Sequence, residues 1–388
     1  MPEFDESREV AQQAAFDAVL MHALNVERNT RGMTADMSAI VEESGGDLAR
    51  ELGERLENLA PGELSALSRY QPGQRLDRFS TRVQGVIQLI NEWASTLSAS
   101  ILEKWQSDAV EFVEQEIDFN QELFASILAD SAPFALSARQ VYRRAMEEPV
   151  MGRFVESALR DEATATRERV YATIRGGITQ GQTNQQVIRS LRGTKTSNYR
   201  DGVLNTTRNN LSSIVRTGRT HLSSTTNDDV YEALGVDELV FTATIDGRTS
   251  LVCSSTDGSI WKRSDPKLPR PPLHWNCRSV LVPYFGGKIS GERPYVKAFK
   301  PIRRIRKDDR PEDMVGQVKA STSMSEFLRR PGNAAFAKQY FGETRYRLFK
   351  EGKISIKQMI RADGTRYSIA ELRARNREAF REVFGDAA

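Results

Sequence analysis

The sequence predicts a mostly helical α+β fold, with a long-helix bundle at the N-terminus, a small mixed domain with a short antiparallel sheet, and a C-terminal helical module. Three observations predict this class. Apolar residues repeat with a helical period through about the first 160 residues, strand-like alternation with Asp-Gly turns begins after Gly235, and helical spacing returns near the C-terminus. We therefore expect consecutive domains at residues 1–160, 161–290 and 291–388.

The first domain is expected to be acidic and helical, with one long helix near residues 81–129. The apolar positions of this helix alternate steps of four and three, which is the spacing of a heptad seam. The seam consists of Val83, Ile87, Ile90, Ala94, Leu97, Ile101 and Trp105. Such a stripe has to be buried, so either helices at Glu3–Arg31 and Ala35–Leu59 cover it or it contacts other copies of the chain.

Helical signals continue after the long helix. Apolar spacing predicts helices around Val141–Thr173, Asn184–Leu191 and Asn205–Leu234. Thr183 is suited to cap the second of these helices, and Gly235 is suited to end the third.

The stretch that follows predicts the antiparallel sheet. "DELVFTATIDGRTS" alternates like a strand and ends in an Asp-Gly turn, and "CSSTDGSIW" holds a second such turn. "RSVLVPYF" is expected to be the closing strand, with Pro283 at its end or on a sheet edge. Residues 286–313 are charged and weakly periodic, which predicts a basic linker, and the last helix should begin near Ile369 with Ser368 as its N-cap.

Charge is nearly balanced over the whole chain but divided between its halves. Residues 1–160 hold 27 Asp+Glu and 15 Lys+Arg out of totals of 52 and 55, which leaves 25 acids and 40 bases for the remainder. A basic surface gains affinity for nucleic acid by releasing counterions from phosphates. We therefore expect that DNA, as a partner, would contact the second half of the chain.

The most basic run is "KAFKPIRRIRKDDR", with seven basic and two acidic residues. Its candidate DNA contacts are Lys297, Lys300, Arg303, Arg304, Arg306 and Lys307. The alternative is a solvated linker, which is what most charge runs are.

Membrane and secretion signals are missing from the sequence. It contains no run of about eighteen apolar residues, and the start "MPEFDESREV" is acidic where a secretory signal would be basic and then apolar. We expect a soluble protein that is made in a cytoplasm.

Cys253 and Cys277 are the two cysteines, and His274 lies three residues before the second. These three residues could supply ligands to a structural zinc ion, with Asp246 or Asp257 as a fourth. A disulfide between Cys253 and Cys277 is a second interpretation, and two buried thiols beside a histidine that hydrogen-bonds the backbone are a third.

Catalysis by a cysteine is a further interpretation. A thiol nucleophile needs a base within hydrogen-bond reach and a group that orients the base, for which His274 and either Asp246 or Asp257 are candidates. The sequence has no strand-to-helix nucleophile turn, no glycine-rich phosphate loop and no His-Glu-x-x-His motif. It therefore favours a protein that is not an enzyme.

Several of these features occur together in a recognisable order. They are the "VRTGRT" helix with Asn227 downstream, the turn at residues 246–250, Cys253, the Asp257-Gly258 turn and "PPLHWNCRS". In this combination, residues 170–285 resemble the phage head morphogenesis family, also called minor head or Mu F-like proteins. "FLRRPGNAAFAKQYFGETRYRLFKEGKIS" is more loosely similar to a segment that often follows in the same family.

The resemblance implies a structural virion component inside the phage head, at the portal vertex, that assists head assembly and DNA packaging or delivery. It implies the portal protein and packaged DNA as partners, together with other capsid proteins or copies of the chain itself. Two alternatives stay open. One is an internal ejection protein that meets DNA or membrane during infection, and the other is an enzyme, because related domains occur fused to toxin domains.

Many members of this family carry a CxxC and a final CRC, where this sequence has Ser250 and Ser279. The departure removes two thiolates and leaves Cys253, His274 and Cys277 as a reduced version of the site. We expect the segment to act as a clasp that holds a proline-rich loop against a hairpin.

Charged residues around the cysteines are expected to belong to this clasp. They are Asp246, Arg248, Asp257 and Arg278. A guanidinium matches a carboxylate with two parallel hydrogen bonds, so Arg278 is expected to pair with Asp246.

Overall fold

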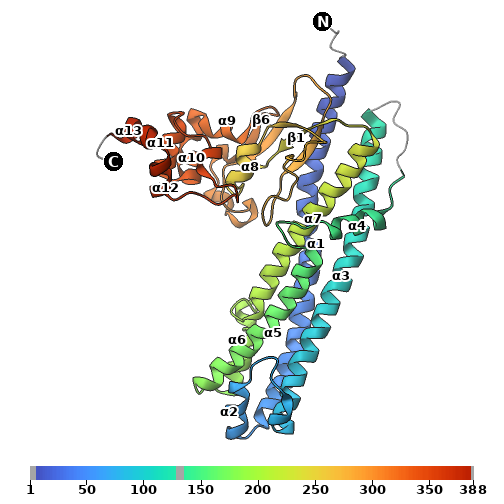
Figure 1. Cartoon of the computed structure of the whole chain (residues 1–388), viewed down its shortest axis with the longest axis vertical. Coiled ribbons are helices and arrows are strands. Elements are labelled where there is room, and N and C mark those ends of the chain that lie inside the picture. Colours follow the sequence, from blue (N-terminus) through green and yellow to red (C-terminus); the bar gives the residue numbers. More distant parts are fainter. Residues whose placement is uncertain (1–5, 128–134, 386–388) are drawn as a thin grey trace. The chain divides into compact units, whose positions relative to one another are not determined.

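The computed structural model describes residues 6–127 and 135–385, and it confirms the mostly helical α+β class. Seven helices fill most of the first 233 residues (Figure 1). They are α1 Glu6–Glu57, α2 Pro61–Arg69, α3 Thr81–Ile127, α4 Ala138–Glu147, α5 Val155–Thr179, α6 Asn184–Arg192 and α7 Leu204–Ala233. None of the helices in the described ranges is long and apolar enough to cross a membrane.

The first three-stranded sheet has the order β3-β1-β4, with both pairs antiparallel. Its strands are β1 Glu238–Thr242, β3 Ile260–Lys262 and β4 Val280–Tyr284. Strand β4 is an edge strand, and Pro283 lies in it opposite Leu239, as expected for a residue without a backbone N–H.

A second three-stranded sheet has the order β2-β5-β6 and was not expected. It consists of β2 Ile245–Asp246, β5 Glu292–Val296 and β6 Val315–Lys319, with β2 parallel and β6 antiparallel to β5. The expectation of a linker over residues 286–313 is therefore wrong for β5. A short helix, α8 Leu251–Thr256, follows β2 where the sequence suggested only turns.

The C-terminal module consists of short helices, as the sequence predicted (Figure 1). These helices pack around a core that is rich in aromatic side chains. These helices are α9 Met324–Arg329, α10 Ala334–Phe341, α11 Glu343–Lys350, α12 Ile369–Arg375 and α13 Arg377–Phe384. The side chain of Ser368 accepts a hydrogen bond from the Glu371 N–H and caps α12, which confirms the predicted start at Ile369.

Two helix boundaries differ from the sequence-based prediction. Helix α1 runs through Gly32, where a break was expected, because a glycine inside a helix costs only about 1 kcal/mol relative to alanine. The helix expected at Val141–Thr173 is instead divided into α4 and α5. Between them lie Pro149, which has no backbone N–H to donate, and Met151 and Gly152, both with positive φ.

The contacts divide the chain into two compact units. Unit 1 comprises Met1–Val26, Glu116–Leu136 and Ser223–Ala388, and unit 2 comprises Glu27–Gln115 and Ser137–Leu222. These units interleave segments from along the chain, whereas the three expected domains are consecutive. The consecutive boundaries at residues 160 and 290 remain a prediction.

The heptad seam of α3 is buried within the chain. All seven of its residues, from Val83 to Trp105, are at most 7 % exposed. The Trp93 Nε1 donates to the Ser44 carbonyl of α1 at 3.0 Å, and the Tyr171 hydroxyl of α5 donates to the Ile87 carbonyl at 3.1 Å. The alternative in which helices of the same chain cover the seam is therefore confirmed for unit 2.

Candidate functional site

The candidate site lies in unit 1 and is built from one short helix and one loop. Cys253 is in the first turn of α8, whose N-cap Ser250 accepts a hydrogen bond from the Cys253 N–H at 3.3 Å. His274 and Cys277 come from the loop before β4, where the Cys277 N–H donates to the His274 carbonyl at 3.1 Å. Asn276 has a φ of 59°, which lets the loop turn tightly between the two.

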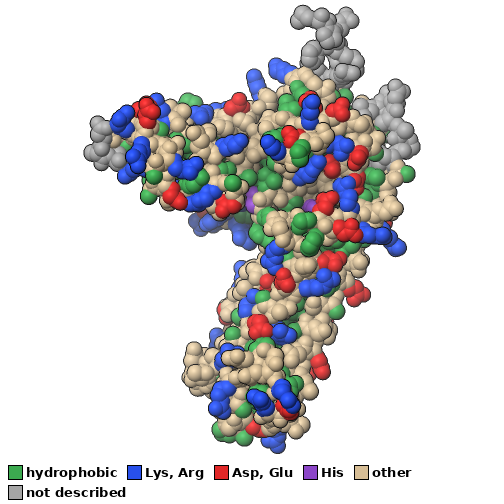
Figure 2. All heavy atoms as spheres, viewed as in Figure 1, with side chains coloured by type: hydrophobic (Ala, Val, Ile, Leu, Met, Phe, Trp, Pro, Cys, Tyr) green, Lys and Arg blue, Asp and Glu red, His purple; other side chains and the backbone are tan. Residues whose placement is uncertain are grey.

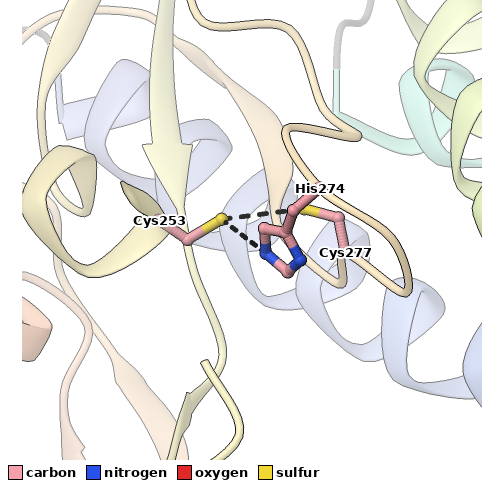
Figure 3. A group of neighbouring side chains, drawn as sticks. All are labelled: Cys253, His274 and Cys277. Carbon is pink, nitrogen blue, oxygen red and sulfur yellow. Dashed lines mark hydrogen bonds between the residues drawn. The ribbon is translucent and has the colours of Figure 1, made fainter. Parts of the chain in front are cut away.

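The side chains of Cys253, His274 and Cys277 converge (Figure 3). The Cys253 Sγ lies 3.3 Å from the His274 Nε2 and 3.7 Å from the Cys277 Sγ. Both cysteines are buried and not bonded to each other. The His274 Nδ1 lies 2.9 Å from the Trp275 carbonyl oxygen, so it carries a proton and Nε2 is directed toward the sulfurs.

The two thiols differ in acidity. A hydrogen bond from Cys253 lowers the pKa of Cys277 well below its ordinary value despite burial, and His274 lowers it further. The bond to Cys277, together with burial, raises the pKa of Cys253. Burial alone would lower the pKa of His274, but its bond to Cys277 and the charge of that sulfur raise it. The group therefore favours a thiolate at Cys277.

Asp246 is held by two arginines next to this cluster. Arg278 donates to both of its carboxylate oxygens, at 2.6 and 2.7 Å, in the bidentate pairing that was expected. Arg248 adds a 2.9 Å bond from Nη2. Burial acts to raise the pKa of Asp246, but the bonds and charges of these arginines outweigh it and keep the pKa below its ordinary value.

Asp257 belongs to a second, fully buried pair whose partner the sequence did not reveal. It accepts hydrogen bonds from the Ala243 N–H at 2.7 Å, the Met324 N–H at 2.6 Å and Arg293 at 3.2 Å. Burial raises the pKa of Asp257, and Arg293 and the two backbone N–H groups oppose this effect. Arg293 lies in β5, a strand that was not predicted because its sequence is charged.

Neither aspartate is part of the cysteine–histidine cluster, because each is engaged by arginine. The expectation that Asp246 or Asp257 supplies a fourth metal ligand, or orients His274 for catalysis, is therefore not supported. The hydroxyls of Ser250 and Ser279 instead lie beside the Cys253 sulfur and act to lower its pKa. These are the two positions at which the family resemblance led us to expect further cysteines.

The candidate DNA contacts form a separate group on the stretch that follows β5. Two of the six are engaged by neighbouring carboxylates, since Lys297 pairs with Asp313 at 2.6 Å and Arg306 with Asp309 at 3.0 Å. The remaining four are exposed, namely Lys300, Arg303, Arg304 and Lys307.

Residues 168–282 match the family described as Phage Mu protein F like protein. The matched range begins in α5 and ends in β4, so it includes all three residues of the cysteine–histidine cluster. Neither the curated proteins nor the solved structures contain a match to the chain.

Proposed function

Because residues 168–282 belong to the Mu F-like family of phage head proteins, we propose that the chain is a minor head protein of the virion. It would lie inside the head at the portal vertex and assist head assembly and DNA packaging or delivery. The family match is the observation that carries this proposal. The charge division supports it, because an acidic N-terminal half suits a protein partner and a basic remainder suits DNA.

The proposal is tested on purified particles. Nuclease-treated mature virions and empty precursor heads should both contain the chain, and crosslinking should join it to the portal protein. Particles assembled without portal should lack it. If the chain is abundant in infected cells but missing from both kinds of particle, it is not a head protein.

Within this role, we propose that Cys253, His274 and Cys277 hold a structural zinc ion. Two thiolates on one tetrahedral zinc, at about 2.3 Å each, lie about 3.8 Å apart, and a thiolate and an imidazole nitrogen lie about 3.5 Å apart. The corresponding distances here are 3.7 and 3.3 Å. The Trp275 carbonyl oxygen holds the Nδ1 proton of His274, which leaves Nε2 as the nitrogen that would bind the metal, and zinc would fasten α8 to the loop before β4.

The zinc proposal has two competitors that one set of measurements separates. Protein purified without chelators should contain stoichiometric zinc, and His274→Gln should lose it while His22→Gln, the matched control, retains it. If the protein contains no zinc and its cysteines are alkylated only after reduction, Cys253 and Cys277 form a disulfide. A protein without zinc whose thiols react on unfolding alone has two core cysteines, and both results would refute zinc.

We also propose that the site is structural and not catalytic. A thiolate–imidazole pair suited to catalysis needs an accessible sulfur, and both cysteine side chains here are about 1 % exposed. His274 is oriented by a backbone carbonyl instead of a carboxylate. Slow alkylation of the native protein by iodoacetamide is expected, and rapid, selective alkylation of Cys277 would contradict a structural role.

A further inference from the structure

The C-terminal module contains a basic pocket outside the Mu F-like region. The pocket has a volume of about 550 Å³ and lies in unit 1, where the turn before α12 meets the junction of α12 and α13. It is lined by Lys357, Gln358, Ile360, Tyr367, Arg375 and Asn376. Residues 343–385 hold eleven Lys+Arg and six Asp+Glu. Figure 2 shows many blue basic side chains on the C-terminal module, at the upper left of the view.

The cations of the pocket wall are not neutralised by neighbouring acids. Lys357 and Arg375 are exposed, and neither pairs with a carboxylate among residues 6–127 and 135–385. The nearby carboxylate of Glu371 is occupied by Arg361 at 2.5 Å. The positive charge at this pocket is therefore available to a ligand.

Several arginines are gathered around one tyrosine. The guanidinium carbons of Arg361 and Arg375 each lie 4.7 Å from the centre of the Tyr367 ring. Arg345 donates to the Tyr367 carbonyl at 2.7 Å, and burial together with the charge of Arg366 lowers the pKa of Arg345. These like charges repel one another, and an anion bound among them would relieve that repulsion.

We propose that this pocket seats a backbone phosphate of DNA, with Lys357 and Arg375 as direct contacts. Guanidinium and ammonium groups recognise phosphate and carry no sequence information. The Tyr367 ring is occupied by two guanidinium groups, so it does not offer a surface on which a base can stack. Binding at this site is therefore independent of DNA sequence.

The choice of DNA as the source of the phosphate rests on the proposed function. The existence of the pocket and its positive charge are observed in the structure and do not depend on that function. The basic run at residues 297–307 is the competing location. Part of that run is neutralised, since Lys297 and Arg306 have carboxylate partners, whereas the pocket cations do not. The run still has four exposed cations, so variants at both locations are needed to separate their contributions.

The test uses the full-length protein and two fluorescent duplexes of unrelated sequence, with binding followed by anisotropy over a range of salt concentrations. The double variant Lys357→Ala/Arg375→Ala should bind both duplexes at least about tenfold more weakly, with the slope of log Kd against log salt reduced by about two. The matched control Lys195→Ala/Arg200→Ala removes the same charge from exposed positions in unit 2 and should bind like the wild type. Unchanged thermal unfolding verifies that each variant is folded.

Three results would overturn the proposal. Unchanged binding by the pocket variant, with a loss in Lys300→Ala/Arg303→Ala, would assign DNA to the competing run. Binding of a polyglutamate peptide through Lys357 and Arg375, without DNA binding, would make the partner an acidic protein. Absence of DNA binding by wild-type protein that is still found in virions would refute the pocket inference alone and leave the proposed head function standing.

Discussion

Replacement of Asp257 by asparagine tests how unit 1 is held together. The side chain of Asp257 is fully buried and connects the end of α8 to three other segments, because its partners lie after β1, in β5 and at the start of α9. All of these partners donate hydrogen bonds, so only an ionised carboxylate satisfies them. An asparagine side chain at this position would keep one acceptor oxygen and turn an NH2 group toward the remaining donors.

The expected cost follows from what is left unpaired. Arg293 is 2 % exposed, and removing one partner of a buried ion pair costs about 3–5 kcal/mol. A buried backbone N–H that loses its acceptor, at Ala243 or Met324, costs about 1–3 kcal/mol more. Arg293 keeps its hydrogen bonds to the Ala243 and Thr322 carbonyls, which reduces the overall loss of stability. We expect Asp257→Asn to lower the free energy of unfolding of unit 1 by about 4 kcal/mol, a large share of the roughly 5–15 kcal/mol of a typical domain.

Urea unfolding followed by circular dichroism measures this loss. Asp308→Asn removes the same charge from an exposed position and should change the free energy of unfolding by less than about 0.5 kcal/mol. Arg293→Met in the Asp257→Asn background removes the buried guanidinium that has lost its carboxylate partner, and should recover part of the lost free energy of unfolding. A loss below about 1 kcal/mol for Asp257→Asn would refute the reasoning, because it would mean that the carboxylate is not the common acceptor of these segments.

Three further predictions concern other positions. Gly218→Ala should destabilise unit 2 by about 1–3 kcal/mol, because the new Cβ would lie 2.6 Å from the Trp105 ring. Gly176→Ala places its Cβ in open space and should stabilise unit 2 by up to about 1 kcal/mol. Thermal unfolding of the two variants and the wild type measures both effects. Burial lowers the pKa of His221 in the folded state below its ordinary value of 6.5, which applies to the unfolded state. The neutral form of His221 therefore contributes stability above pH 6.5, and this contribution is lost as the pH falls from 6.5 toward the lower pKa of the folded state. Chemical unfolding from about pH 7.5 to about pH 5 should show this loss in the wild type and less of it in His221→Gln. Ser279→Cys, which adds a thiol beside the cluster, should slow the removal of zinc by a chelator; equal rates would argue against a shared metal.

Helices with a clear apolar period could be predicted from the sequence, and segments whose charge is buried could not. The seam from Val83 to Trp105 was recognised because seven apolar residues at steps of four and three have few alternatives to a buried helix face. The strand β5 was not recognised, because Arg293 lies buried in it and a buried arginine resembles a solvated one in sequence. Its partner Asp257 is 36 residues away and gives no local signal.

The candidate site was predictable to the extent that it is local. The spacing of His274 and Cys277 places them in one turn, and the choice of Asp246 for Arg278 followed from guanidinium–carboxylate chemistry. The distance between Cys253 and the other two residues depends on how β1 pairs with β4, which no short motif encodes. The roles of Asp246 and Asp257 as arginine partners could likewise be seen only in the folded chain.

The division of charge along the sequence does not coincide with a division of the core. The sheet β3-β1-β4 belongs to the basic part of the chain, yet its core contains Phe16, Leu20 and Phe124 from the acidic first 160 residues. Gln12, which is fully buried, donates to the Pro283 carbonyl at 3.0 Å and accepts from the Phe285 N–H at 2.7 Å. Burial of each large apolar side chain contributes about 1.5–3 kcal/mol, so a fragment that begins at residue 161 would lack several such contributions and expose the apolar face they cover. Such a fragment is expected to aggregate, and its failure to bind DNA would say nothing about the charge of the native surface. The contribution of the basic residues is therefore measurable only by substitutions in the full-length chain.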